Sequence, residues 1–137
     1  MAVIQDLDGV VEHHTVFLQA GTNEQFVPVL RSLSLFLGGC KLPSGQPVTS
    51  AEIVFKDDFK PEPALVHVYE AYAYFEMTLP MSVYDAYLRL AESGQRLGFV
   101  ALYEPDGGRL LRFHLFSQHP SGLQAAVPPS LAERLRA

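Results

Sequence analysis

Cysteine is nearly absent from this sequence, since Cys40 is the only one in 137 residues. A single cysteine excludes an internal disulfide and a thiolate-rich zinc site. It gives no support for secretion, so we expect a cytoplasmic protein. Cys40 follows Gly38 and Gly39 and has Lys41 but no candidate base beside it. This setting predicts an ordinary buried or loop thiol rather than a nucleophile.

Long apolar runs are also missing. None approaches the ~20 residues that a membrane-spanning helix needs, and the longest candidate, 64–80, is interrupted by His67, Glu70 and Glu76. Residues 1–9 have no basic residue and contain Asp6 and Asp8, unlike a signal peptide. We therefore expect a soluble protein without membrane association.

Basic residues are scarce in the first part of the chain. Residues 1–80 contain ten acids and four bases, whereas residues 81–137 contain five acids and six bases, and the net charge is −5. Nucleic-acid affinity depends largely on lysine and arginine neutralising phosphates, so this balance disfavours, without excluding, nucleic-acid binding. The chain also lacks a glycine-rich phosphate loop and a Gly-x-Ser-x-Gly motif.

Hydrophobic periodicity predicts an α+β fold. Asp8-Gly9 is typical of a hairpin turn between an arm at 1–7 and a strand at 10–20. Phe26, Val29, Leu30, Leu33 and Leu37 recur at helical spacing and predict a helix over 22–37, which Pro28 either kinks or makes start nearer Val27. Further predicted elements are strands at 51–56, 64–79, 97–103 and 110–117, a helix at 83–93, and a hairpin turn at Glu104-Pro105-Asp106-Gly107-Gly108.

This order, β-α-β-β-α-β, is typical of a ferredoxin-like sandwich with two main helices on one face of an antiparallel sheet. The N-terminal strand and the C-terminal hairpin strand are additions to that core. Residues 1–118 are predicted to form one α+β domain. Residues 119–137 are a tail rich in proline and alanine, in which Ser130 can cap a short helix.

The stretch 64–79 is predicted to be one long strand, because it is rich in β-branched and aromatic residues. Alternation assigns His67, Ala73 and Phe75 to the core face and Tyr72 and Tyr74 to the outer face.

The segment Val3 to Val10 resembles the first motif of the haloacid-dehalogenase family, an apolar strand followed by Asp-x-Asp-Gly-Val. The resemblance covers about ten residues. It implies a nucleophile at Asp6, a general acid/base at Asp8, and a Mg²⁺ site on a doubly wound parallel sheet. A hairpin turn at Asp8-Gly9 explains the same residues, and we expect no metal or cofactor.

Two short segments, Val16 to Leu18 and Ala71 to Glu76, resemble the paired motifs of an RNA-recognition motif. The resemblance implies that Phe17, Tyr72 and Tyr74 stack on the bases of a single strand. Glu70 and Ala71 depart from the basic residue and glycine of that pattern, so nucleic-acid binding is the third of our hypotheses.

The first hypothesis is a non-catalytic binding or regulatory protein that uses an aromatic sheet face. An open face with Phe17, Val68, Tyr72, Tyr74 and Phe116 is an apolar patch that a soluble monomer avoids. Symmetric packing of two such sheets would bury it, as in the dimeric α/β-barrel families that this layout resembles. We therefore expect a homo-oligomer or a protein partner, or coverage by the N-terminal arm or the tail.

The second hypothesis is a small enzyme or ligand-binding protein of that dimeric barrel kind. His13, His114 and Arg112 could converge near Tyr72 or Tyr74 and line a polar pocket in an aromatic wall. Because His13 and His14 are adjacent on a predicted strand, they point to opposite faces and form no metal signature.

Overall fold

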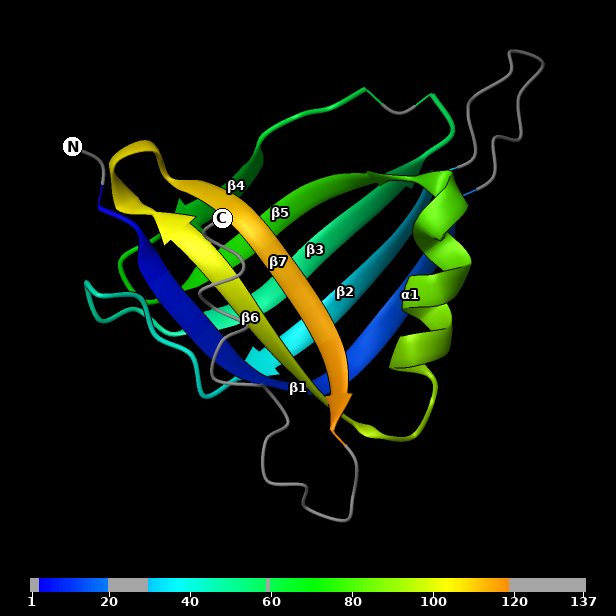
Figure 1. Cartoon of the computed structure of the whole chain (residues 1–137), viewed down its shortest axis with the longest axis horizontal. Helices are drawn as coiled ribbons and strands as arrows, with labels where there is room; N and C mark the ends of the chain where they lie inside the picture. Colours follow the sequence, from blue (N-terminus) through cyan, green and yellow to red (C-terminus); the bar gives the residue numbers. More distant parts are fainter. Residues whose placement is uncertain (1–2, 20–29, 59, 119–137) are drawn as a thin grey trace.

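The computed structural model describes residues 3–19, 30–58 and 60–118, and within them seven strands close into a barrel (Figure 1). The strand order is β1-β2-β3-β5-β4-β7-β6, and β6 pairs back to β1. All neighbours are antiparallel except β3 and β5, which run parallel. The elements are β1 (Gln5–Gln19), β2 (Leu30–Gly38), β3 (Val48–Lys56), β4 (Ala64–Val68), β5 (Ala73–Pro80), η1 (Met81–Val83), α1 (Tyr84–Ala91), β6 (Arg96–Glu104), η2 (Pro105–Gly107) and β7 (Arg109–Gln118).

Aromatic rings from three strands fill the middle of the barrel. Phe75 lies edge-on to both Phe99 and Phe113, with ring centroids 6.1 Å apart in each case. Phe99 and Phe113 stack at 5.7 Å. Phe75 and Phe99 are fully buried. A partner or ligand therefore has the wall of the barrel available to it rather than this packed interior.

Helix α1 packs against one end of the barrel (Figure 1). The Tyr84 ring meets the buried Phe55 ring edge-on at 5.0 Å, and the Arg31 guanidinium lies 5.0 Å from the Tyr84 ring centroid. Among the described residues, no helix is long and apolar enough to cross a membrane.

The predicted ferredoxin-like α+β sandwich is wrong. The described part of the chain is a strand barrel with one short α-helix, α1, in place of two main helices. The predicted helix at 83–93 is present as η1 and α1, and the predicted hairpin around Glu104 to Gly108 is confirmed by β6, η2 and β7. The extra C-terminal strand is thus β7, and it belongs to the barrel itself.

The predicted helix at 22–37 is wrong over its described part, where the chain forms β2. Leu33, Leu35 and Leu37 are buried and alternate with the half-buried Ser34 and Phe36. Helical spacing and strand alternation coincide at Leu33 and Leu37, and Leu35 fits the strand pattern alone. Residues 22–29 of that prediction and the tail at 119–137 lie outside the described residues.

The predicted hairpin turn at Asp8-Gly9 is also wrong, because Gly9 lies inside β1. Gly9 pairs with Phe99 of β6, and Val10 pairs with both Gly98 of β6 and Gly38 of β2. A Cβ atom at Gly9 would lie 2.6 Å from the Gly38 carbonyl oxygen and 2.8 Å from the Phe99 ring. Glycine is therefore needed at this position because the Gly38 carbonyl and the Phe99 ring approach it closely, and not because the chain turns there.

The predicted long strand at 64–79 is two strands joined by a turn. β4 ends at Val68 and β5 begins at Ala73, and the Tyr69 N–H donates to the Tyr72 carbonyl at 2.8 Å. The prediction that Ala73 and Phe75 are core residues is confirmed. The turn changes the alternation in β4, so Val66 is buried and His67 lies on the outer face beside Tyr74, contrary to its predicted core position.

Candidate functional site

Four aromatic rings stack in series on the outer surface of β4, β5 and the turn between them. Tyr72 stacks on Tyr69 with ring centroids 5.0 Å apart, and Tyr69 lies parallel to Tyr74 at 6.1 Å. Tyr74 stacks on His67 at 4.7 Å, with ring planes 23° apart. Tyr69 and Tyr72 keep 47% and 41% of their surface exposed. Rings that support one another in this way present a rigid aromatic surface to solvent.

The tyrosine hydroxyls in this stack influence one another. The pKa of Tyr74 is raised above its ordinary value, first by a side-chain hydrogen bond with Tyr69, then by partial burial and by nearby groups that include Glu76. The Tyr74 phenol therefore carries its proton at neutral pH. Its hydroxyl can donate a hydrogen bond to a bound group and adds no negative charge to the face.

Two glutamates lie next to the stack on neighbouring strands. Glu52 of β3 pairs in register with Glu76 of β5, and the Glu52 carboxylate accepts hydrogen bonds from the hydroxyls of Ser34 and Ser50, the latter at 3.0 Å. Glu76 Oε1 lies 3.4 Å from His67 Nε2, near enough for attraction, but the contact does not have hydrogen-bond geometry.

Within the described ranges, neither glutamate forms an ion pair with a lysine or arginine. We call the surface formed by Tyr69, Tyr72, Tyr74, His67, Glu52 and Glu76 the tyrosine–glutamate face. It combines exposed ring faces with two carboxylates that no described lysine or arginine neutralises.

A second aromatic pair extends the same outer surface towards β1. His13 of β1 stacks on Phe36 of β2 with ring centroids 4.3 Å apart and planes 16° apart. Phe36 pairs in register with Ser50, and Ser50 pairs with Tyr74. One row of outward side chains thus runs from His13 across the sheet to the tyrosines.

The predicted aromatic patch is divided among separate surfaces. Tyr72 and Tyr74 belong to the tyrosine–glutamate face, and Val68 lies beside the turn with 44% of its surface exposed. Phe17 is 58% exposed on β1, opposite Ser32, so β2 and β3 separate its strand from β5. Phe116 lies on the outer face of β7 opposite Gly98. The base-stacking trio implied by the RNA-recognition resemblance is therefore not assembled.

The predicted pocket of His13, His114 and Arg112 is not assembled either. Arg112 and His114 pair with Leu102 and Val100 of β6, and Val100 in turn pairs with Asp8 of β1. His13 lies five residues further along β1 than Asp8, or roughly 17 Å at the usual strand rise. His13 therefore joins the row that leads to Tyr74, and His114 lies on a different surface.

The two aspartates of the haloacid-dehalogenase resemblance lie on β1 of an antiparallel pair with β6. The doubly wound parallel sheet that the resemblance implies is absent from the described part of the chain. Among the same residues, no three histidine, cysteine or acidic side chains are grouped so that they could hold a metal ion.

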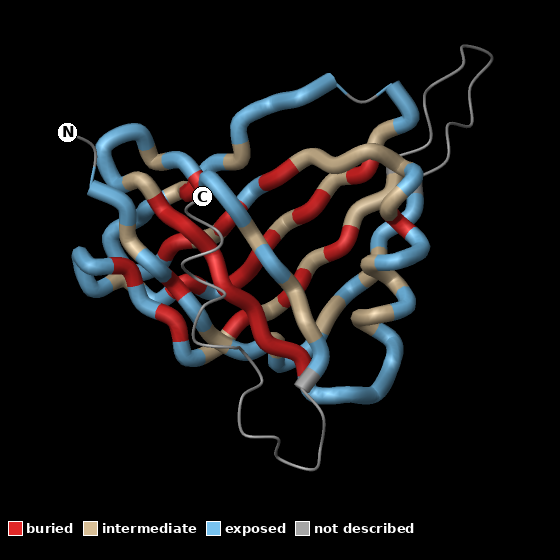
Figure 2. Tube along the Cα trace, viewed as in Figure 1, coloured by how far each residue is buried: buried red, intermediate tan, exposed pale blue. Residues whose placement is uncertain are grey.

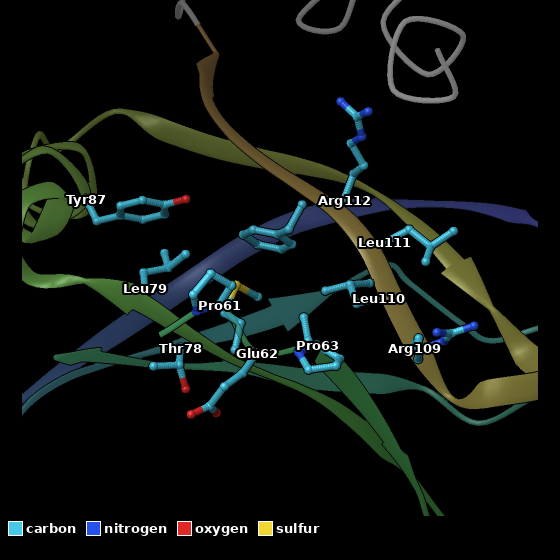
Figure 3. A pocket seen from close by; sticks show the side chains of 13 residues that line it. Pro61, Glu62, Pro63, Thr78, Leu79, Tyr87, Arg109, Leu110, Leu111 and Arg112 are labelled. Atoms are coloured by element: carbon cyan, nitrogen blue, oxygen red, sulfur yellow. The ribbon is translucent and has the colours of Figure 1, made fainter. Parts of the chain in front are cut away.

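The wall of the barrel has a seam between β4 and β7. These strands pair only at Ala64 with Leu110 and at Leu65 with Arg109 within the described residues. Beyond Ala64 the seam widens into a groove of about 430 Å³. Figure 3 shows Pro61, Pro63, Leu79 and Leu110 around it, the Tyr87 ring entering from α1, and the Arg112 side chain extending away. Its lining is therefore mainly apolar.

Cys40 is buried, and burial followed by the negative charge of Asp8 raises the pKa of its thiol to about 11. At neutral pH such a thiol is almost entirely protonated and is a poor nucleophile. The thiol therefore contributes to packing, as the sequence predicted.

Two residues of the tyrosine–glutamate face, and Phe36 next to it, were not predicted to be there, for identifiable reasons. A single strand over 64–79 places Tyr69 on the same, core side as His67, and the structure instead has a turn after Val68. Phe36, which extends the face, was included in a helix. Glu52 lies in a predicted strand, and its alternation with the buried Ala51 and Ile53 was a usable signal.

Comparison of the chain with protein-family models, with curated proteins and with solved structures finds no match in any of the three.

Proposed function

We propose that this chain is a non-catalytic binding protein and that its tyrosine–glutamate face holds a segment of a protein partner. The observation that carries this proposal is the stack of Tyr72, Tyr69, Tyr74 and His67 beside two glutamates that form no ion pair with a described lysine or arginine. Tyrosine is enriched at the centres of protein interfaces, where its ring buries a large area at low conformational cost.

The charge of the face favours a cationic group on the partner. An arginine or lysine side chain laid over a tyrosine ring gains about 0.5–2 kcal/mol, depending on how far it is desolvated. From that position it can also reach the Glu52 or Glu76 carboxylate. Glu76, which pairs with Leu65 on one side, lies next to Tyr74 along the outer sheet surface, and Glu52 pairs with Glu76 on the other side. The same acidity disfavours a nucleic-acid phosphate, which needs basic contacts.

A fluorescein-labelled peptide that alternates arginine and proline tests this function by anisotropy. Its control is the same peptide with citrulline, which keeps the shape of arginine and removes the charge. We expect the arginine peptide to bind at least about tenfold more tightly, which corresponds to ~1.4 kcal/mol. Replacing both glutamates, Glu52→Gln with Glu76→Gln, should remove most of that difference.

Two results would contradict the proposal: equal affinity for both peptides, or arginine-peptide binding that survives Tyr72→Ala with Tyr74→Ala. Leu111→Ala is the matched control, because Leu111 is 41% exposed on β7 and lies outside the face. Sedimentation of the free protein distinguishes a second copy of this chain from a different partner, since only self-association depends on its own concentration.

The seam groove supports a second candidate function, binding of a small apolar ligand. Mainly apolar clefts of some hundreds of Å³ with a few polar groups are common ligand sites. Met77 and Phe113 line the groove along with the prolines of the 57–63 connection. Titration with a series of alkyl and aryl alcohols, followed through the amide signals of Leu79 and Leu110, tests it. Shifts that saturate in wild type and vanish in Leu79→Arg would support it, and unchanged signals would exclude it.

A further inference from the structure

His67 is the only histidine of the tyrosine–glutamate face, and histidine is the side chain whose charge ordinarily changes between pH 5 and 8. It pairs in register with Tyr74 of β5, and the two rings stack at 4.7 Å. Buried and more exposed residues alternate over the first part of β5, as along other strands in Figure 2, so Tyr74 and Glu76 both point outward. His67 therefore lies beside an aromatic ring and a carboxylate of the same outer surface.

The Nε2 nitrogen of His67 is buried and has no hydrogen-bond partner among the described residues. Glu76 Oε1 lies 3.4 Å from it. In a neutral imidazole only one of the two ring nitrogens carries a proton, whereas both carry one in the imidazolium form. Protonation therefore ensures that Nε2 presents an N–H to the carboxylate. The Glu76 side chain is 49% exposed, so it has room to rotate into line with that N–H.

Arg109 is the basic residue of β7 that pairs with β4. It lies opposite Leu65, two residues before His67 on the same outer side of β4. The Arg109 guanidinium donates hydrogen bonds to the Glu104 carboxylate and forms an ion pair with it. The charge of Arg109 is therefore neutralised by Glu104 rather than by Glu76.

The titratable neighbours of His67 within the face are acidic or neutral. Glu52 pairs in register with Glu76 and accepts hydrogen bonds from two serine hydroxyls. Tyr74 keeps its proton at neutral pH, because a side-chain hydrogen bond with Tyr69 raises its pKa. A positive charge on His67 thus has Glu76 as its adjacent negative partner, with Glu52 on the next strand.

We propose that His67 makes the tyrosine–glutamate face sensitive to pH: the protonated imidazole pairs with Glu76, and the face then releases a cationic partner. This inference rests on the function proposed for the face and adds its regulation. The positioning of His67 by the Tyr74 ring, together with the 3.4 Å contact to Glu76, carries it.

The partner's guanidinium and the His67 imidazolium compete for the same carboxylate, and their positive charges repel each other. When His67 is neutral, the Glu76 carboxylate is available to the partner. Binding of the partner therefore weakens as the pH falls and His67 gains its proton. Because the two equilibria are linked, a bound partner also hinders protonation of His67 by the same factor.

Calorimetric titration of the full-length protein with the unlabelled arginine–proline peptide, at pH 8 and at pH 5.5, tests this proposal. The arginines of the peptide stay charged across this range. We expect binding to the wild type to be at least about fivefold weaker at pH 5.5. His67→Phe keeps an aromatic ring beside Tyr74 but cannot be protonated, so its affinity should be the same at both pH values. The matched control is His114→Phe on a different surface, opposite Val100, and it should retain the fivefold loss.

Tight binding with equal wild-type affinity at both pH values would overturn the proposal and leave the proposed function standing. A loss in His67→Phe as large as in wild type would do the same. A peptide that binds at neither pH would instead contradict the function proposed for the face. Nuclear magnetic resonance of the free protein tests the switch itself: the Glu76 carboxyl carbon and the Tyr74 ring protons should shift together in one step between pH 8 and pH 5.5. The absence of this step in wild type, or its persistence in His67→Phe, would overturn the proposal whether or not the peptide binds.

Discussion

Tyr69 and Tyr72 stack on each other across the turn that joins β4 to β5, with ring centroids 5.0 Å apart and ring planes 22° apart. The backbone closes the same turn through the hydrogen bond from Tyr69 to Tyr72. The stack therefore holds the first two rings of the tyrosine–glutamate face in one arrangement before any partner arrives.

Removing one ring of this pair should affect stability only slightly. Tyr72 is 41% exposed, so Tyr72→Ala removes a stacking contact of about 0.5–1.5 kcal/mol and leaves no buried cavity. We expect the free energy of unfolding in urea to fall by about 1 kcal/mol or less. A loss of several kcal/mol would mean that the ring is part of the barrel's packing and is not an exposed binding element.

Gly9→Ala should destabilise the barrel much more than Gly38→Ala. At Gly9 the new methyl group meets the Gly38 backbone carbonyl and the buried Phe99 ring, and overpacking of that kind costs about 1–3 kcal/mol. At Gly38 the methyl group meets only the end of the exposed Glu12 side chain, which can move aside. Urea unfolding of both variants checks the difference. Equal losses would show that Gly9 is not a point of close approach.

Phe75→Ala should cost about 3–5 kcal/mol, because it opens a cavity between Phe99 and Phe113 in the middle of the barrel. Phe17→Ala is the matched control, since Phe17 is 58% exposed and its loss should stay within ~0.5 kcal/mol. Thermal or urea unfolding of the two variants compares them directly. Similar losses would contradict the assignment of Phe75 to the interior and Phe17 to the surface.

Alkaline pH should destabilise the protein through its buried phenols. Burial raises the pKa of Tyr87 and of Tyr103 above the ordinary tyrosine value near 10. Above about pH 10 the unfolded chain releases these protons first, so it binds fewer protons than the native state and stability falls as pH rises. Below that pH the full stability remains. The urea midpoint of unfolding should be lower at pH 11 than at pH 9. Tyr87→Phe should reduce this difference. An equal difference in Tyr87→Phe would contradict the contribution of the buried Tyr87 phenol.

The sequence was sufficient to predict the local features that depend on alternation and turn chemistry. The burial of Phe75 and the hairpin with Asp106-Gly107-Gly108 at its tip follow from residue types within a few positions. The global topology was not predictable in the same way. Parallel pairing of β3 with β5 connects residues distant in the chain, and no local pattern encodes it.

Two local ambiguities in the sequence led to the wrong prediction of the fold class. Leu33 and Leu37 satisfy both helical and strand spacing, and pairing on both edges of β2 selects the strand. The turn at Glu70-Ala71 has none of the usual turn residues, and its backbone needs none, because no described residue other than glycine has a positive φ. Missing that turn concealed the position of Tyr69 and His67 in the tyrosine–glutamate face.

The most direct test of the central claim is a map of amide chemical shifts during titration with the arginine–proline peptide. We expect saturable shifts concentrated at Tyr69, Tyr72, Tyr74, Glu52 and Glu76, and their loss in Tyr72→Ala with Tyr74→Ala. Shifts that cluster around the seam groove at Leu79 and Leu110, or no saturable shifts at low salt, would contradict the claim that the tyrosine–glutamate face is the binding surface.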